Sequence, residues 1–344
     1  MFEIKSYKGT YTVEFVEHIP NTSTKGDIFV IDSRIYDLYY KDSVFDNSYY
    51  LVDATEESKT LCGVQNLIDF LVDNGFKRNN RIIAIGGGVI QDLVSFTSSI
   101  LYRGVNWEFY PTTLLSQCDS CIGSKTSINY GGVKNILGGF HPPKRIHVNR
   151  MFLNTLPDSE IKSGVGEMLH YFILNHKLDI SEKMVNDCDL IANIEEYISE
   201  SLAIKKEMIE KDEFDQGERN LFNFGHTFGH AIESVSEYRV NHGQAVTSGM
   251  YMACMLSLKL DLIDQSLFDR VENILVKNMS DYKIEDVEGY IQSLKKDKKN
   301  VSDMLTCILL TENYGTNIEI SYDEVVTVLT NMYTNIDRYK ASTF

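Results

Sequence analysis

The sequence has no excess of basic residues. Its 344 residues include 33 lysines and arginines against 49 aspartates and glutamates, which gives a net charge of −16 at pH 7. Nucleic acids and anionic membranes are bound through a basic face. The composition therefore argues against both as partners. A phosphate-bearing substrate would need a local basic pocket on an acidic protein.

Cysteine is scarce as well. The six cysteines are irregularly spaced, whereas a disulfide framework needs a denser and more regular set. Cys118 and Cys121 form a lone C-x-x-C, a pattern that also occurs in redox sites and zinc knuckles. No second pair or nearby histidine completes a knuckle. Reduced structural thiols are the preferred interpretation.

Long apolar runs are also missing, and we expect no signal peptide. The longest apolar stretch, residues 245–260, contains Thr247, Ser248, Ser257 and Lys259, so it predicts a packed helix and not a membrane span. Residues 1–10 show no basic region followed by an apolar core. Internal repeats and low-complexity tracts do not occur. We expect a cytoplasmic protein that is long enough for two domains.

The order of patterns along the chain predicts an α/β domain followed by a mainly helical one. Short β-type runs and helical periodicity alternate up to residue 111, as in a parallel sheet with crossover helices. From Pro157 onward helical periodicity dominates, apart from a β-type pair at 306–313 and 316–322 that can form a hairpin or edge strands. We predict domains at 1–150 and 151–344.

A glycine-rich turn follows the apolar run 81–85. Gly86, Gly87 and Gly88 would let backbone N–H groups approach a pyrophosphate at the start of a helix. The full G-x-G-x-x-G is absent because position 91 is Gln, and a tight structural turn explains the glycines equally well. Thr112 and Thr113 can add hydroxyl donors, and Asp92 can orient a ribose or a ring.

One carboxylate and two imidazoles stand in settings typical of a metal site: Glu167 in GVGEMLHYF, His226 in NFGHTFGHAIE and His242 in VNHGQAV. Three protein ligands leave a position open on a catalytic zinc ion. His226 and His230 share a helical face. Two interpretations compete: both histidines bind metal, or one binds metal while the other contacts substrate. A pair of structural helix histidines is the plainer alternative.

Polar residues that precede His226 extend this pattern. Arg219 and Asn223 are predicted on the same helical face as His226. Lys205 is predicted on a separate helix, because Gly217 and the DEFD turn intervene. Lys125 and Lys134 flank a predicted loop at 126–133 that can fold over an anion. Taken one at a time, each lysine is more simply explained as a solvated surface residue.

Together these segments resemble the 3-dehydroquinate synthases and the wider sugar-phosphate cyclases. The motifs that carry the resemblance run from about residue 56 to 299 and include GGGVIQD, YRG, PTTLLSQCDSCIGSKTSIN, KNILGGFHPP, LPDSEIKSGVGEMLHY, NFGHTFGHAIE, NHGQAV and KKDKKN. The resemblance implies a Rossmann-like NAD-binding domain followed by a helical metal-binding domain, with the active site in the cleft between them.

The resemblance also implies roles for individual residues. Zinc, or cobalt in its place, would be held by Glu167, His226 and His242. NAD would be contacted by Asp32, Glu56, Lys59, Gly87, Gly88, Asp92, Thr112, Thr113, Lys125, Lys134 and Thr155. The substrate would be surrounded by Asp119, Lys125, Lys134, Asn135, His170, Lys205, Arg219, Asn223, His230 and Lys298. Arg103 would reach the substrate phosphate of a neighbouring subunit, which implies a homodimer.

The implied reaction is the cyclisation of 3-deoxy-D-arabino-heptulosonate 7-phosphate to 3-dehydroquinate. NAD⁺ transiently oxidises a ring hydroxyl, which acidifies the neighbouring C–H, and zinc stabilises the developing alkoxide. Phosphate leaves, the ketone is reduced again, and the ring opens and closes again by an intramolecular aldol step. No net redox change results, whereas a polyol dehydrogenase of the same general fold would produce NADH.

The sequence departs from the family pattern at three places. His170 stands where E-V-I-K-Y has lysine, Gln244 stands where H-G-E has glutamate, and GSKT (123–126) replaces G-G-K-T. Arg219 and Asn223 are kept, and an arginine suits a carboxylate-bearing substrate. The departures favour an alternative, a related cyclase that acts on another sugar phosphate or an amino analogue.

Overall fold

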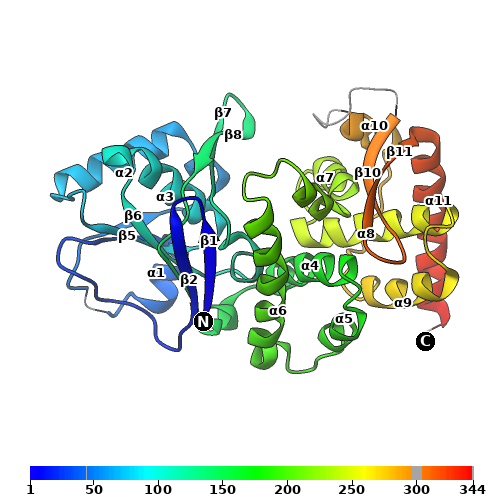
Figure 1. The fold of residues 1–344 in the computed structure, drawn as a ribbon, viewed down its shortest axis with the longest axis horizontal. Coiled ribbons are helices and arrows are strands. Elements are labelled where there is room, and N and C mark those ends of the chain that lie inside the picture. The colour runs from blue at the N-terminus through cyan, green and yellow to red at the C-terminus, as the bar shows by residue number, and fades with distance from the viewer. Residues whose placement is uncertain (44, 296–303, 343–344) are drawn as a thin grey trace. The chain divides into compact units, whose positions relative to one another are not determined.

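The computed structural model describes residues 1–43, 45–295 and 304–342, which form two compact units (Figure 1). The first unit holds Met1–Leu156 and Ile194–Phe214, and the second holds the described residues of Pro157–Asn193 and Asp215–Phe344. The chain thus returns to the first unit at Ile194–Phe214. The predicted domains, 1–150 and 151–344, are each one continuous segment and do not include this return. Residues 193–214 have the same helical periodicity as their neighbours, so no sequence pattern marks the return.

A seven-stranded sheet organises the first unit. Its strand order is β1-β2-β9-β6-β5-β3-β4; β1 is antiparallel to β2, and all other neighbours are parallel. The strands are β1 (Phe2–Ser6), β2 (Gly9–Phe15), β3 (Ile28–Asp32), β4 (Tyr49–Val52), β5 (Arg81–Gly86), β6 (Asn106–Pro111) and β9 (Arg145–Val148). The central strand β5 is apolar and buried over most of its length, as expected for a parallel strand covered on both faces.

Helices of the first unit follow the strands in the predicted alternation. They are α1 (Ser33–Tyr39), α2 (Leu61–Asp73), α3 (Gly88–Ile100) and α6 (Leu190–Lys211), with short helical turns η1 (Glu56–Ser58), η2 (Leu101–Arg103), η3 (Ser116–Ser120) and η4 (Arg150–Thr155). In α2 the buried residues Val64, Leu67 and Leu71 recur at helical spacing, so one face of the helix packs inward.

The order of strands changes direction between β3 and β5. From β3 the chain goes outward to β4 and then returns to the other side of β3 as β5. In open parallel sheets, ligands bind outside the carboxyl ends of the strands at such a switch point. Asp32 ends β3, and Gly86–Gly88 follow β5. The glycine-rich turn therefore lies where this fold class binds nucleotides.

The segment 126–133, predicted as a loop, is part of a β-hairpin. Strands β7 (Lys125–Tyr130) and β8 (Val133–Phe140) pair antiparallel, and Lys125 is opposite Phe140. Gly131 and Gly132 form the turn with φ values of 60° and 77°. Two adjacent residues with positive φ favour a tight hairpin turn. The loop prediction was wrong because the polar tip hides the strand alternation.

The second unit is mainly helical. It contains α4 (Asp158–Leu174), α5 (Leu178–Val185), α7 (His226–Val235), α8 (His242–Lys259), α9 (Gln265–Leu275), α10 (Val287–Lys295), α11 (Tyr322–Ser342) and the helical turn η5 (Glu218–Asn223). Strands β10 (Met304–Leu310) and β11 (Gly315–Ser321) form the predicted late hairpin. The predicted fold class, a Rossmann-like α/β part and a helical part, is confirmed.

Two of the absences noted in the sequence also hold in the described residues. None of their helices is long and apolar enough to cross a membrane, and the stretch 245–260 lies almost wholly in the buried helix α8. All six cysteines are free thiols, and Cys118 and Cys121 are buried. Burial raises the pKa of Cys121 to about 12, so this thiol stays protonated, and both cysteines of the C-x-x-C are buried structural thiols.

Arg81 at the start of β5 joins two buried carboxylates. Its guanidinium lies 2.7 Å from Asp27 and 2.5 Å from Glu108, and these acids are only 2% and 6% exposed. We predict that Arg81→Met destabilises the protein by about 3 kcal/mol, because the buried Asp27 loses its ion-pair partner and the buried Glu108 keeps only His147. Urea unfolding of both proteins measures this. A free energy of unfolding within 0.5 kcal/mol of wild type, the usual range for a surface substitution, would contradict the assignment.

Candidate active site

Two helices of the second unit approach each other through glycines. A Cβ atom on Gly166 of α4 would collide with the carbonyl oxygen of Gly243 in α8, and a Cβ on Gly243 would collide with the carbonyl oxygen of Ser163. Only glycine allows so close a backbone approach. Gly166 directly precedes Glu167, and Gly243 directly follows His242. The close contact therefore brings a carboxylate and an imidazole together.

The predicted metal ligands converge in this unit. Oε2 of Glu167 lies 3.7 Å from Nε2 of His226 and 3.5 Å from Nε2 of His242. One ligand atom from each residue falls within 4.8 Å of the other two. Glu167 is 4% exposed, and its Oε2 has no hydrogen-bond partner among the described residues. A buried, unpartnered carboxylate oxygen needs a cation beside it.

Each imidazole is oriented by an oxygen atom on its far side. Nδ1 of His226 lies 3.2 Å from the carbonyl oxygen of Phe224, and Nδ1 of His242 lies 3.3 Å from Oε2 of Glu233. Such contacts place the proton on Nδ1 and leave Nε2 as the ligand atom. Asn241 caps α8 by accepting from the backbone N–H of Gln244, which fixes where His242 begins the helix.

The site is strongly polarised. Burial alone would raise the pKa of Glu167, but the imidazoles of His226 and its neighbours hold it well below its usual range. Burial lowers the pKa of His226 well below its usual value, although Glu167 opposes this. Burial would also lower the pKa of His242, but the neighbouring carboxylates of Glu167 and Glu233 raise it to about 10.

These residues fit a divalent metal ion. A carboxylate and two imidazoles are ligands that zinc and cobalt accept. Bonds of about 2.0–2.1 Å in a tetrahedral site put ligand atoms roughly 3.4 Å apart, close to the 3.5 and 3.7 Å observed. A metal ion would take the place of the proton that Glu167 and Glu233 hold on His242.

Glu233 is a site residue that sequence reasoning missed. It follows His226 by seven positions and His230 by three, so the helical spacing that paired the histidines also includes it. His230, Glu233 and His242 form a second group with ligand atoms within 4.8 Å. Glu233 contacts Nδ1 of His242 while Glu167 faces Nε2, so Glu233 orients this imidazole. His230 is the exposed member of the set.

Arg219 and Asn223 do not share a helix with His226. Both lie in η5, and Gly225, with φ of 78°, separates this turn from α7. The same-face prediction was wrong, because the helical spacing was extended across a glycine that breaks the helix. Asn223 donates to the carbonyl oxygen of Asn220 at 2.8 Å. Lys205 lies on α6 as predicted.

The glycines and threonines expected to contact NAD lie in the first unit, at the switch point of the sheet. Gly87 caps α3, and Gly88 is exposed, with open space where a Cβ would be. The backbone N–H of Thr112 donates to the carbonyl oxygen of Gly86 at 3.0 Å, which joins the ends of β5 and β6. Burial raises the pKa of Asp32 at the end of β3. The backbone can therefore receive a pyrophosphate at the helix start.

Asp92 belongs to a buried charge cluster at the side of α3. Its carboxylate lies 2.6 Å from Nζ of Lys59, which is 5% exposed. Burial raises the pKa of Asp92, Lys59 opposes this and Glu56 adds to it. Glu56 accepts from the Nδ2 of Asn129 at 2.7 Å, which connects the cluster to β7. Lys59 is therefore not a surface lysine.

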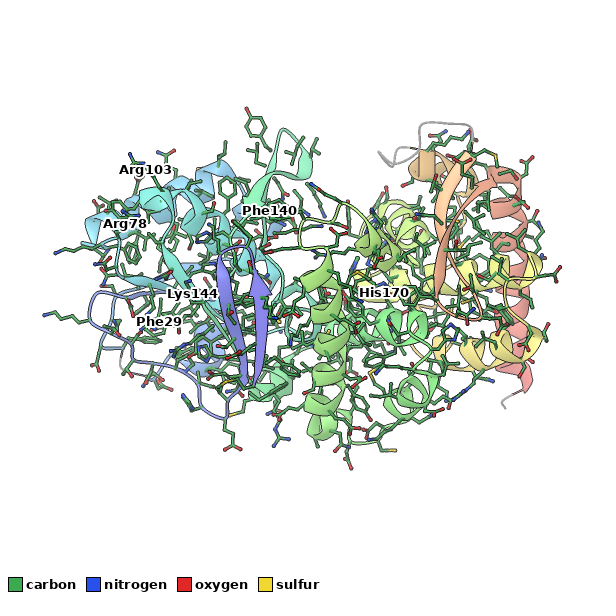
Figure 2. The ribbon with its side chains drawn as sticks, in the orientation of Figure 1. Phe29, Arg78, Arg103, Phe140, Lys144 and His170 are labelled. Atoms are coloured by element: carbon green, nitrogen blue, oxygen red, sulfur yellow. The ribbon has the colours of Figure 1, made fainter. Side chains whose placement is uncertain are left out.

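The other predicted residues of the first unit differ in exposure. Lys205 is 6% exposed and lies 2.6 Å from Oδ1 of Asp119, so the surface interpretation was wrong for this lysine. The hydroxyl of Thr155 lies 2.8 Å from that of Tyr39. Exposed side chains belong to Arg103 (Figure 2), Lys125, Lys134 and Asn135. Lys298 lies outside the described residues.

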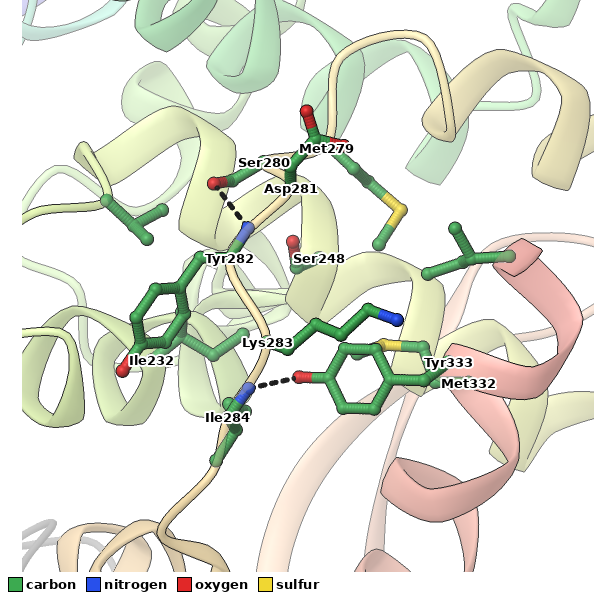
Figure 3. A pocket seen from close by; sticks show the side chains of 12 residues that line it. Ile232, Ser248, Met279, Ser280, Asp281, Tyr282, Lys283, Ile284, Met332 and Tyr333 are labelled. Carbon is green, nitrogen blue, oxygen red and sulfur yellow. Dashed lines mark hydrogen bonds between the residues drawn. The ribbon is translucent and has the colours of Figure 1, made fainter. Parts of the chain in front are cut away.

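One cavity of the second unit is not lined by these ligands. It measures about 190 Å³ and is lined by α7, α8, α11 and the segment 279–284 (Figure 3). Ile232 and Ser248 contribute from the two helices that carry the histidines, but Glu167, His226 and His242 do not line it. Its wall offers no group of metal ligands. The chemistry therefore points to the ligand cluster.

Comparison with known proteins decides the family. Residues 49–163 match the N-terminal part of 3-dehydroquinate synthases, and residues 164–300 match the C-terminal part. The 3-dehydroquinate synthase of Clostridium tetani is 36% identical over 318 residues, which are 88% of this chain and 85% of that protein. The chain belongs to the 3-dehydroquinate synthase family.

Solved structures confirm the fold of this 3-dehydroquinate synthase family member. A 2-deoxy-scyllo-inosose synthase, complexed with carbaglucose-6-phosphate, NAD⁺ and Co²⁺, has a TM-score of 0.85 at 23% identity and covers 95% of this chain and 98% of its own. The 2-epi-5-epi-valiolone synthase of Streptomyces hygroscopicus, with NAD⁺ and Zn²⁺ bound, has a TM-score of 0.77 at 21% identity and covers 94% and 97%.

Two departures from the family pattern can be located in the structure. His170 is fully buried in α4, and its Nδ1 lies 3.5 Å from Oε1 of Glu167. Gln244 is half-buried, and its Nε2 lies 3.4 Å from the carbonyl oxygen of Asn278. Glu233 is thus the carboxylate beside His242, and the site keeps a negative charge there although Gln244 is neutral.

We predict that Gly166→Ala disrupts the ligand cluster without touching a ligand. The added methyl group would push α4 away from α8 and should cost about 1–3 kcal/mol of stability, as overpacking does. The shift should also weaken zinc binding, because it moves Glu167 away from His242. Chemical unfolding and zinc titration measure the two effects. Gly139→Ala, where an added Cβ would meet nothing closer than Thr126 Oγ1 at 3.9 Å, is the control. Unchanged zinc affinity in Gly166→Ala would contradict the proposed origin of the site.

Proposed function

We propose that the protein is an NAD- and zinc-dependent 3-dehydroquinate synthase. It cyclises 3-deoxy-D-arabino-heptulosonate 7-phosphate to 3-dehydroquinate and eliminates phosphate. The observation that carries the proposal is the buried group of Glu167, His226 and His242, found in a chain that matches both parts of this family. The NAD and metal ions bound to the two solved cyclases support the cofactor assignment.

The cofactors supply the steps that side chains cannot. When bound, NAD provides reversible oxidation of a substrate hydroxyl, and the metal ion stabilises negative charge on adjacent substrate oxygens. Gly87 and Gly88 present backbone N–H groups to the pyrophosphate at the start of α3. Lys59 and Asp92 form a fixed, paired charge at the side of this helix, so they position the nucleotide without adding net charge.

The remaining polar residues bind and orient the substrate. Lys205 is held by Asp119 at 2.6 Å, which keeps its ammonium group in one place. Arg219 suits the carboxylate, since a guanidinium can bind both carboxylate oxygens. We also assign substrate contacts to Lys125, Lys134, Asn135, Asn223, His230 and Lys298. Fixed charges of this kind lower the barrier by positioning and by stabilising developing charge.

The alternative substrate class is another sugar phosphate or an amino analogue. His170 and Gln244 favour it, because family members that make dehydroquinate usually carry charged residues there. For Gln244, two contacts weaken this argument for another substrate. Gln244 contacts Asn278, and Glu233 supplies the carboxylate beside His242. Arg219 also favours the substrate that bears a carboxylate, so we place the heptulosonate first.

We further propose a cytoplasmic homodimer in which Arg103 contacts the substrate phosphate bound to the partner. What supports this role is the form of the turn that carries it. Tyr102, Arg103 and Gly104 have φ values of 50°, 65° and 114°, and such a strained run persists only where the surroundings or the function require it. The Arg103 side chain is exposed (Figure 2).

His226→Ala tests the assignment. The variant should lose bound zinc and phosphate release from the heptulosonate 7-phosphate together, because two of three ligands cannot hold the metal ion. Zinc content after dialysis and phosphate release with NAD⁺ measure this. His176→Ala, outside the ligand cluster, should keep both. A zinc-free His226→Ala with full activity would disprove the metal assignment.

A further inference from the structure

His170 has an unusual position for a polar side chain. It is 0% exposed, and neither ring nitrogen has a hydrogen-bond partner among the described residues that meets normal geometry. The nearest polar group is Oε1 of Glu167, 3.5 Å from Nδ1. An unsatisfied buried donor costs about 1–3 kcal/mol. The imidazole therefore needs a role at this place that offsets the cost.

The two oxygens of Glu167 face different groups. Oε2 faces Nε2 of His226 and of His242, and Oε1 faces Nδ1 of His170. His170 follows Glu167 by three positions on α4, so both side chains project from the same helical face. A carboxylate with one oxygen held this way has only the other oxygen left for a metal ion. His170 thus fixes which oxygen coordinates.

Packing prevents His170 from turning away. Its ring meets Phe222 edge to face at 5.8 Å between centroids, and His226 in the same way at 4.9 Å. The Tyr171 ring lies 4.5 Å from the His170 ring and 4.8 Å from the Phe222 ring, measured between centroids. The imidazole is thus enclosed between the metal ligands and the η5 turn. Its complete burial leaves no accessible surface of the ring for a substrate to contact.

We propose that His170 is a positioning residue for the metal-binding carboxylate. It holds Oε1 of Glu167 so that Oε2 points to the metal ion, and it does not contact the substrate. The inference rests on the proposed zinc dependence. It replaces the substrate-contact role that the resemblance implied for this position.

Two matched substitutions test the role. His170→Phe keeps a planar ring but removes the donor, and His170→Asn keeps an amide donor near the place of Nδ1. His170→Phe should weaken zinc binding about 10–100-fold, the usual effect of losing an orienting partner, and His170→Asn should recover most of that loss. Zinc affinity is measured by competition with a chelator. The visible spectrum of the cobalt-loaded protein should shift in His170→Phe and return toward wild type in His170→Asn.

Control measurements separate this role from the others. His176→Phe, at the end of α4, should leave zinc affinity unchanged. At saturating zinc, the KM for the heptulosonate 7-phosphate should be unchanged in His170→Phe. Unchanged zinc affinity with a raised KM would overturn the inference and restore the substrate contact. Equal losses in both His170 variants would also overturn it. Absence of zinc binding by the wild-type protein would instead overturn the proposed function.

A second observation, in the first unit, is independent of the metal site. A pocket of about 170 Å³ lies between the turn of the β1–β2 hairpin and the segment His141–Lys144. Nζ of Lys8 is 2.6 Å from Nδ1 of His141, whose Nε2 lies 2.8 Å from the carbonyl oxygen of Val105. A carbonyl only accepts, so Nε2 carries the proton and Nδ1 accepts from the lysine.

The charge in this pocket is not compensated. Lys8 and Lys144 are exposed and form no ion pair with a described carboxylate, and the Lys8 ammonium lies 5.5 Å from the centroid of the Tyr7 ring. Burial and Lys144 both lower the pKa of Lys8. On a chain with a net charge of −16, two adjacent cations in a concave pocket are most simply balanced by a bound anion. Asn106 also lines the pocket.

From this geometry we infer a second anion site, suited to a phosphate group or an oxyanion of similar size. Equilibrium dialysis with radiolabelled inorganic phosphate tests it. The Lys8→Met/Lys144→Met double variant should bind one phosphate fewer per chain than wild type. Lys25→Met/Lys77→Met removes the same charge from exposed positions of the same unit and should bind the wild-type number. Equal phosphate binding by wild type and both double variants would overturn the site.

Discussion

The candidate active site depends on the glycine contact between α4 and α8. Gly166 and Gly243 let the two backbones approach more closely than any side chain would permit. Their neighbours in sequence, Glu167 and His242, are thereby brought to 3.5 Å. α7 joins by the same means, since a Cβ on Gly229 would lie 2.9 Å from Cα of Val246 in α8. The ligands are placed by helix packing, and flexible loops contribute little.

This packing buries a carboxylate, and the buried charge determines the rest of the site. Taking an ion out of water costs several kcal/mol unless partners compensate. Glu167 is compensated by the imidazoles of His170, His226 and His242, which hold its pKa well below the usual range. Glu233 in turn holds His242. The cluster is therefore a connected set in which each member orients the next.

Much of this could be predicted from the sequence, because local patterns reported local structure. The apolar run before Gly86 gave a central strand and a helix start, and the spacing of His226 and His230 gave a shared helical face. The predictions that failed concerned features that depend on contacts between residues distant in sequence. The burial of Lys205 requires Asp119, and the return of α6 to the first unit has no local signal. The break at Gly225 is local, but only its positive φ distinguishes it from a helical glycine.

The roles of His170 and Glu233 show the same limit. In the sequence alone, His170 is only a departure from the lysine of the family motif, and Glu233 is only an acidic residue in a predicted helix. Their functions depend on which oxygen or nitrogen each faces, and that is a property of three packed helices. Gln244 is the converse case: it departs from the motif, but its amide contacts Asn278, and the carboxylate beside His242 is that of Glu233 on another helix.

The most direct measurement follows phosphate release and NADH absorbance together, with purified protein, zinc and NAD⁺. The heptulosonate 7-phosphate, glucose 6-phosphate and sedoheptulose 7-phosphate are supplied in separate reactions. The account predicts phosphate release from the heptulosonate alone, with no lasting NADH signal, because the cofactor is regenerated in each turnover. Lasting NADH without phosphate release would indicate a dehydrogenase, and phosphate release from another sugar alone would assign a different cyclase substrate. Either result would contradict the account.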